Sequence, residues 1–185
     1  MTPLAAAVHF CPECGFDNQT YRSMPHQLKP GTMLDGRYLI GRVLGEGGFG
    51  ITYVGLDTLL ELKVAVKEFY MTGVNSRNHM TSDAVQITNG GFTEDFTHNR
   101  RRFLDEAQVL ARLSGEPGIV MVRDFFEANN TAYIVMEFLS GQTLQSYLER
   151  NGKLRWSTTW QLMKPVLESL KRVHAHGIIH RDISP

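Results

Sequence analysis

Apolar and polar positions follow the pattern of β-strands along five short segments of this chain. These segments are 38–44, 51–56, 61–69, 120–128 and 131–136. The first two flank a glycine-rich stretch, and the last two flank Asn129-Asn130, a residue pair typical of a tight hairpin turn. Because strands joined by short turns pair in the antiparallel direction, the pattern predicts an antiparallel sheet.

A helix is predicted over residues 101–113, between the third and fourth strands. At about 100° per residue, one arc of this helix is apolar. The arc consists of Phe103, Ala107, Leu110 and Leu113. Glu106 projects between Leu113 and Leu110 on the same helical projection. A carboxylate inside an apolar stripe costs free energy unless it has a partner, so we expect Glu106 to pair with a basic side chain; the alternative is that its side chain bends out to solvent.

Two more helices are predicted after the last strand. A short one spans about 142–150, and a longer one begins near residue 158. Its apolar positions step by three or four, at Trp160, Met163, Leu167, Leu170 and Val173. Thr158 and Gln161 could form a capping box at its start, and Gly177 is a typical helix stop.

Two stretches carry no such periodicity. Residues 71–98 are rich in Gly, Asn, Ser and Thr, with one strand candidate at 84–87, and we expect an irregular insertion there without chemistry of its own. Residues 1–36 are predicted to be a separate leader, with 25–31 as its linker.

Composition narrows the functional classes. With 185 residues, the chain can form one domain, or one domain and part of a second. Lys+Arg and Asp+Glu both number 19, which gives no electrostatic case for nucleic acid or an anionic membrane as the main partner. No apolar run has the length of a membrane span, and the start lacks the pattern of a signal peptide. Two cysteines make no disulfide framework, so a cytoplasmic location is expected.

The glycine-rich stretch is a candidate phosphate loop. Gly45, Gly47 and Gly50 have G-x-G-x-x-G spacing, which lets a backbone approach a polyphosphate closely. Dinucleotide-binding folds share this spacing, but their motif must open a helix, and segment 51–56 reads as a strand. The G-x-x-x-x-G-K-[ST] motif of P-loop NTPases is absent from the sequence. A strand–loop–strand hairpin that covers a nucleotide fits best.

The third strand adds a candidate cation. Leu62, Val64 and Val66 alternate along it with Lys63, Ala65 and Lys67, so the two sets face opposite sides. For an isolated strand the plain interpretation is a half-buried strand with two solvated lysines. After a glycine hairpin, Lys67 is instead a candidate phosphate-binding ammonium and the expected partner of Glu106.

The leader contains Cys11 and Cys14 in a C-x-x-C that resembles one knuckle of a zinc ribbon. The chain has no other cysteine. His9 and His26 could complete four ligands, but their spacing fits no standard zinc finger. We expect a degenerate half-ribbon; a complete site, a site completed elsewhere and plain exposed thiols are the alternatives, and a redox motif is disfavoured.

With His180-Arg181-Asp182 after the long helix, the chain resembles a eukaryotic-like serine/threonine protein kinase of the bacterial type. Glycine loop, V-A-V-K, helix glutamate, hinge and H-R-D occur in family order. The resemblance implies an α+β fold: a kinase small lobe, made of an antiparallel sheet and one helix, and the first helices of the large lobe. The implied divisions are a leader (1–36), a small lobe (37–138) and an incomplete large lobe (139–185) that stops in the catalytic loop.

The resemblance also implies roles for residues at an ATP site. Leu44 and Ala65 would sandwich the adenine with Thr52 above it, and Met136 would be the gatekeeper. Backbone groups of Glu137 and Leu139 would bind the adenine edge. The glycines Gly45, Gly47, Gly48 and Gly50 would cover the phosphates. Lys67 would contact the phosphates and pair with Glu106, and Asp182 would accept the proton of the substrate hydroxyl.

Departures from the family pattern limit this prediction. Thr52 replaces the usual Val, and Ser184 replaces a lysine that helps to neutralise the γ-phosphate. The Mg²⁺ ligands of the family would lie past Pro185. We therefore expect ATP-dependent phosphorylation of protein Ser/Thr residues as the family activity, with the 185-residue chain alone inactive and the long helix exposing an apolar patch. The alternative is a non-catalytic, kinase-like module that binds nucleotide or another protein. The protein substrate is not predicted.

Overall fold

The computed structural model describes residue 17, residues 20–88 and 90–179, and residue 183. The described residues form two compact units. One unit contains those up to Gln108 together with Val122–Phe138, and the other contains Val109–Met121 and those from Leu139 onward.

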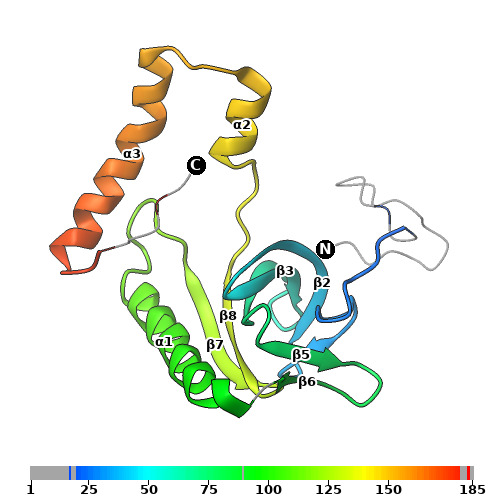
Figure 1. Cartoon of the computed structure of the whole chain (residues 1–185). Coiled ribbons are helices and arrows are strands. Elements are labelled where there is room, and N and C mark those ends of the chain that lie inside the picture. The colour runs from blue at the N-terminus through cyan, green and yellow to red at the C-terminus, as the bar shows by residue number, and fades with distance from the viewer. Residues whose placement is uncertain (1–16, 18–19, 89, 180–182, 184–185) are drawn as a thin grey trace. The chain divides into compact units, whose positions relative to one another are not determined.

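Six strands of the first unit form a curled antiparallel sheet (Figure 1). They are β1 (Met33–Leu34), β2 (Tyr38–Gly47), β3 (Gly50–Asp57), β4 (Leu62–Phe69), β7 (Val122–Ala128) and β8 (Thr131–Glu137). Their order across the sheet is β1-β2-β3-β4-β8-β7. All five predicted strands are therefore confirmed, and the sheet has one further short strand, β1.

Two tight turns fix the register of the sheet. Gly47 pairs with Gly50, so the glycine stretch is the tip of the β2–β3 hairpin. Asn129 and Asn130 connect β7 to β8 with φ angles of 51° and 55°. Both residues lie in the left-handed region, as a two-residue type I′ turn requires. The hairpin predicted at these asparagines is confirmed.

Helix α1 (Thr93–Arg112) packs on one face of the sheet, beside β7 in Figure 1. The ring centroid of Phe69 in β4 lies 5.2 Å from that of Phe96 and 5.5 Å from that of Phe103. The predicted start at residue 101 is wrong, because the helix begins eight residues earlier. Phe96 extends the apolar stripe back by seven residues, and Glu94 and Asp95 in the first turn complement the helix dipole.

The prediction of an irregular insertion with one strand at 71–98 is also wrong. Strands β5 (Asn75–Asn78) and β6 (Ser82–Ile87) form a separate two-stranded hairpin there. The sequence of β5 is Asn-Ser-Arg-Asn, which has no apolar alternation. Tertiary contacts define it instead: Arg77 is buried against the main sheet, and the backbone N–H of Val85 donates to the carbonyl of Asn129 (2.8 Å).

The second unit contains two helices, α2 (Leu144–Asn151) and α3 (Trp156–Ala175). Helix α2 begins close to its predicted position, where the Thr143 hydroxyl accepts the backbone N–H of Ser146 (3.1 Å). Helix α3 begins two residues before Thr158, and its N-cap Arg155 makes no side-chain cap. The predicted capping box is therefore wrong: Thr158 already lies inside the helix, and the Thr159 hydroxyl donates to the carbonyl of Arg155 (3.2 Å).

The end of α3 was predicted correctly. Gly177 has a φ of 73°, and its N–H donates to the carbonyl of His174 (2.9 Å) while the N–H of Ile178 donates to that of Val173 (3.3 Å). This pair of bonds is the Schellman motif. The large apolar side chains of α3 that are exposed are Trp156, Trp160, Leu162 and Leu167.

Neither α3 nor another helix among the described residues has the length and apolar character needed to cross a membrane.

Candidate active site

The β2–β3 hairpin presents an exposed glycine edge. A Cβ added at Gly45, Gly47 or Gly48 would meet no atom of the described protein within 4 Å. At Gly50 the same Cβ would lie 2.8 Å from the Glu68 carbonyl oxygen, so only glycine fits between β3 and β4 there. The first three glycines therefore leave open space next to the backbone, and the fourth permits the close approach of two strands.

Lys67 lies directly across from Thr52 in the β3–β4 pairing, and Ala65 lies across from Met136 in the β4–β8 pairing. Residues opposite each other in a ladder, and residues two apart in a strand, share one face of a sheet. These four predicted site residues therefore project from the same face.

The side chains of Lys67 and Glu106 lie together on this face. Lys67 Nζ is 3.8 Å from Glu106 Oε1 and 5.4 Å from the ring centroid of Phe103. The Lys67 side chain is 35% exposed and that of Glu106 55%. The predicted pairing of Glu106 with Lys67 is therefore present, but the carboxylate lies at the surface and not inside the apolar stripe. An ion pair this exposed contributes at most about 1 kcal/mol to stability. The Lys67 side chain remains accessible to solvent, because about a third of it is exposed.

Three of the predicted adenine contacts belong to strands of this sheet. Leu44 is exposed on β2, and Met136 and Glu137 are half-buried at the end of β8. Leu139 is 67% exposed and belongs to the second unit. Asp182 lies outside the described residues, as do His180 and Arg181.

Of the four candidate metal ligands of the leader, the structure describes only His26. His9, Cys11 and Cys14 are not described. His26 is described, and its Nε2 lies 2.8 Å from Glu46 Oε1. Within the described ranges, no group of three or more His, Cys, Asp or Glu side chains could hold a metal ion.

A buried polar cluster on the opposite face of the sheet was missed. Glu68 follows Lys67 in β4, and its fully buried carboxylate pairs with the fully buried guanidinium of Arg77. The hydroxyls of Tyr53 and Tyr133 donate to the same carboxylate, at 2.9 and 2.8 Å. The signal was present: Glu68 continues the alternation of Val64 and Val66, whose side chains are buried.

The cluster has the electrostatics of a desolvated ion pair. Burial by itself would lower the pKa of the Arg77 guanidinium, but the charge and hydrogen bonds of Glu68 raise that pKa above its usual value. Burial, together with the Glu68 charge, raises the pKa of the Tyr53 and Tyr133 hydroxyls. Both hydroxyls therefore stay protonated and donate to Glu68.

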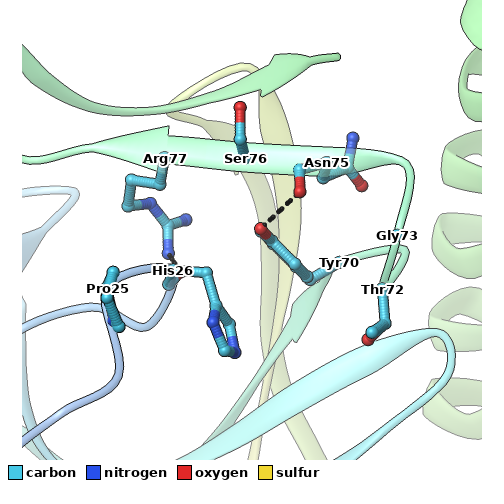
Figure 2. Close-up of a pocket in the computed structure, with 8 residues that line it drawn as sticks. All are labelled: Pro25, His26, Tyr70, Thr72, Gly73, Asn75, Ser76 and Arg77. Carbon is cyan, nitrogen blue, oxygen red and sulfur yellow. Dashed lines mark hydrogen bonds between the residues drawn. The ribbon is translucent and has the colours of Figure 1, made fainter. Parts of the chain in front are cut away.

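A pocket of about 280 Å³ lies near this cluster (Figure 2). It is lined by Pro25, His26, Tyr70, Thr72, Gly73, Asn75, Ser76 and Arg77. Neither Lys67 nor Glu106 lines it, so it is separate from the candidate active site.

A protein-family model described as a protein kinase domain matches residues 38–185 of this chain. The chain is 32% identical over 155 residues to the serine/threonine-protein kinase PrkC of Bacillus subtilis, a region that covers 84% of this chain and 21% of PrkC. It is 33% identical over 159 residues to a probable serine/threonine-protein kinase, PknB, of Lactococcus lactis, covering 85% of this chain and 22% of PknB. The chain thus spans about a fifth of the length of these relatives.

Solved structures give the same picture. The structure titled PpkA-294 apo form superposes with a TM-score of 0.79 at 33% identity, over 86% of this chain and 56% of that one. The kinase domain of PknI from Mycobacterium tuberculosis has a TM-score of 0.63 at 24% identity, over 86% of this chain and 55% of that one. The second likeness concerns the fold alone.

Proposed function

Because this chain belongs to the protein kinase family, we propose that it supplies the nucleotide-binding part of a protein serine/threonine kinase that uses ATP. The observation that carries the proposal is the position of Lys67. Its ammonium projects from the same face as Ala65 and Met136, stays accessible, and is held by Glu106 at 3.8 Å. That arrangement suits a cation that binds phosphate while a carboxylate fixes its side chain.

In this proposal the adenine lies between Leu44 and Ala65, with Thr52 and the gatekeeper Met136 nearby. Backbone groups of Glu137 and Leu139 bind its edge. The backbone at Gly45, Gly47, Gly48 and Gly50 covers the phosphates, where the absence of side chains leaves room for them. Bound Mg²⁺ would neutralise charge that develops on the phosphates.

Asp182 is proposed to accept the proton of the substrate hydroxyl as it attacks the γ-phosphate. Lys67 would orient the phosphates and stabilise their charge. Since phosphoryl transfer depends mostly on positioning and charge stabilisation, loss of either residue should reduce turnover more than folding. A non-catalytic, nucleotide-binding module is the second candidate, because Ser184 replaces a lysine that would help to neutralise the γ-phosphate.

Lys67→Met tests the nucleotide site. The wild-type chain should show a higher melting temperature with Mg²⁺ and ATP, and Lys67→Met should show a clearly smaller increase because the phosphates lose a cation. Lys63→Met is a matched control, because it makes the same change four residues earlier in β4. There, Lys63 Nζ lies 4.0 Å from the ring centroid of Phe138. Equal nucleotide-dependent shifts in wild type and Lys67→Met would contradict the assignment.

Two further proposals concern the state of the leader and the cellular location of the protein. We propose that Cys11 and Cys14 form a degenerate half-ribbon, since the chain has no further cysteine. A cytoplasmic location is proposed because the nucleotide site needs ATP and the chain has no disulfide framework.

A further inference from the structure

Segment 24–31, which precedes the sheet, packs against the face that carries the buried cluster. Leu28 is fully buried, and its backbone N–H donates to the Tyr53 hydroxyl (3.1 Å). Gln27 is 7% exposed and closes a turn with Met24, because its N–H donates to the Met24 carbonyl (3.0 Å) and its Oε1 accepts the Met24 N–H (2.9 Å). The segment is thus an ordered part of the first unit.

The β5–β6 hairpin holds this segment by its backbone. Arg77 Nη1 donates to the carbonyl of His26 (2.6 Å), and His79 Nε2 donates to that of Gln27 (2.7 Å). Figure 2 shows the guanidinium of Arg77 next to the backbone of His26, while the imidazole extends away from it. Arg77 is itself fixed by Glu68. The backbone positions of His26 and Gln27 are therefore set by the buried Arg77 and by His79, whose side chain is only 9% exposed.

The side chains of the same two residues grip the glycine hairpin. His26 Nε2 donates to Glu46 Oε1 and Gln27 Nε2 to Glu46 Oε2, both at 2.8 Å. A carboxylate only accepts hydrogen bonds, so the ring nitrogen facing it carries the proton. Glu46 stands between Gly45 and Gly47 in β2 and pairs with Ile51 across the hairpin. Both carboxylate oxygens thus have a donor from segment 24–31.

We propose that His26 and Gln27 are positioning residues that hold the glycine hairpin, through Glu46, in the geometry that receives the nucleotide. This proposal rests on the proposed ATP site. Residues 44–49 are exposed, and a glycine-rich hairpin loses more conformational freedom on ordering than other sequences. The tip is also held by the N–H of Thr72, which donates to the Gly48 carbonyl (3.2 Å). The contacts to Glu46 add a second attachment of the hairpin, which reduces the ordering cost of binding.

The test uses the 185-residue chain with Gln27→Ala, Glu46→Ala and the double variant. Amide hydrogen exchange of residues 46–50, measured without nucleotide, should become about three- to tenfold faster in Gln27→Ala, which removes one hydrogen bond to a partly exposed carboxylate, and at least as fast in Glu46→Ala, which removes both. The double variant should be no faster than Glu46→Ala, because both substitutions act on the same contact. Exchange in β4 and β8 should not change. Lys29→Ala, an exposed residue of the same segment, is the control.

Affinity for ATP with Mg²⁺, measured by calorimetry on the same proteins, completes the test. A several-fold weaker affinity in both single variants, without a further loss in the double variant, supports the positioning role. Unchanged exchange in residues 46–50, or additive effects of the two substitutions, would overturn it. Faster exchange with unchanged affinity would also overturn it, since the grip would then serve the fold alone. If the wild type binds no ATP, the proposed function fails, whereas a wild type that binds like the variants refutes only this inference.

Discussion

At the scale of single residues, the most consequential pair is Glu68 with Arg77. Both side chains are fully buried, and two tyrosine hydroxyls satisfy the remaining acceptor sites of the carboxylate. A buried ion pair adds little net stability compared with apolar residues of the same volume, but removal of one partner leaves an uncompensated charge in the interior. The pair therefore makes the protein sensitive to single substitutions.

Arg77→Met should lower the free energy of unfolding by about 3–5 kcal/mol, because Glu68 would stay buried without its cation. The double variant Glu68→Gln with Arg77→Met should lose less than the two single variants together. Urea denaturation measures each value, and Arg101→Met, which removes an exposed arginine of α1, is the control. A loss in Arg77→Met no larger than in Arg101→Met would contradict the importance of the pair.

Asp57 provides a pH-dependent contribution at the same scale. Arg37 donates to both of its carboxylate oxygens, at 3.0 and 2.7 Å. The hydrogen bonds from Arg37, opposed in part by burial, lower the pKa of Asp57. A carboxyl group with a lowered pKa in the folded state stabilises the protein above its unfolded pKa of about 3.9, and the stabilisation is lost as the pH falls through the folded value.

The stability difference between wild type and Asp57→Asn should therefore be largest above about pH 5 and should shrink below about pH 4. Urea unfolding at a series of pH values from 6 to 3 would measure it. A difference that stays constant across this range would mean that the charge of Asp57 does not contribute.

At the scale of elements, glycines of the β2–β3 hairpin have two different roles: Gly50 allows two strands to approach closely, and Gly48 leaves open space beside the backbone. Gly50→Ala should lower the free energy of unfolding by about 1–3 kcal/mol, because its Cβ would meet the Glu68 carbonyl at 2.8 Å. Gly48→Ala should change it by less than about 0.5 kcal/mol, since nothing lies within 4 Å. Thermal denaturation distinguishes the two.

If the hairpin covers phosphates, Gly48→Ala should still weaken ATP binding although the fold is intact. An unchanged affinity in a titration with Mg²⁺ and ATP would show that the nucleotide does not approach this backbone.

The elements also show where sequence patterns suffice. Five of the six strands of the main sheet and the asparagine turn could be predicted because apolar alternation and left-handed turn residues act locally. The early start of α1 and the β5–β6 hairpin could not, because the evidence for them is tertiary. The first turns of α1 are fixed by the contact of Phe96 with Phe69, and the β5–β6 hairpin is fixed by the ion pair of Arg77 with Glu68. For the site, the sequence predicted the contact of Lys67 with Glu106, whereas it offered the exposure of the carboxylate only as an alternative to that contact; the structure has both.

At the scale of the whole molecule, the two faces of the main sheet have different tasks. One face carries Ala65, Lys67 and Met136 together with α1. The opposite face carries Glu68 and is covered by segment 24–31 and the β5–β6 hairpin. Since Lys67 and Glu68 are neighbours in β4, the buried cluster on one face anchors the strand that presents the candidate phosphate-binding cation on the other.

The covering of that second face has a practical consequence for anyone who trims the gene. The family match begins at residue 38, and an expression boundary chosen from it would delete Leu28 together with the His26 and Gln27 carbonyls that accept from Arg77 and His79. In the truncated polypeptide, the hydroxyl of Tyr53 and the apolar surface that Leu28 covers would be exposed to solvent. A recombinant product that begins at residue 20 or earlier keeps all of segment 24–31 and its contacts with Tyr53, Arg77 and His79.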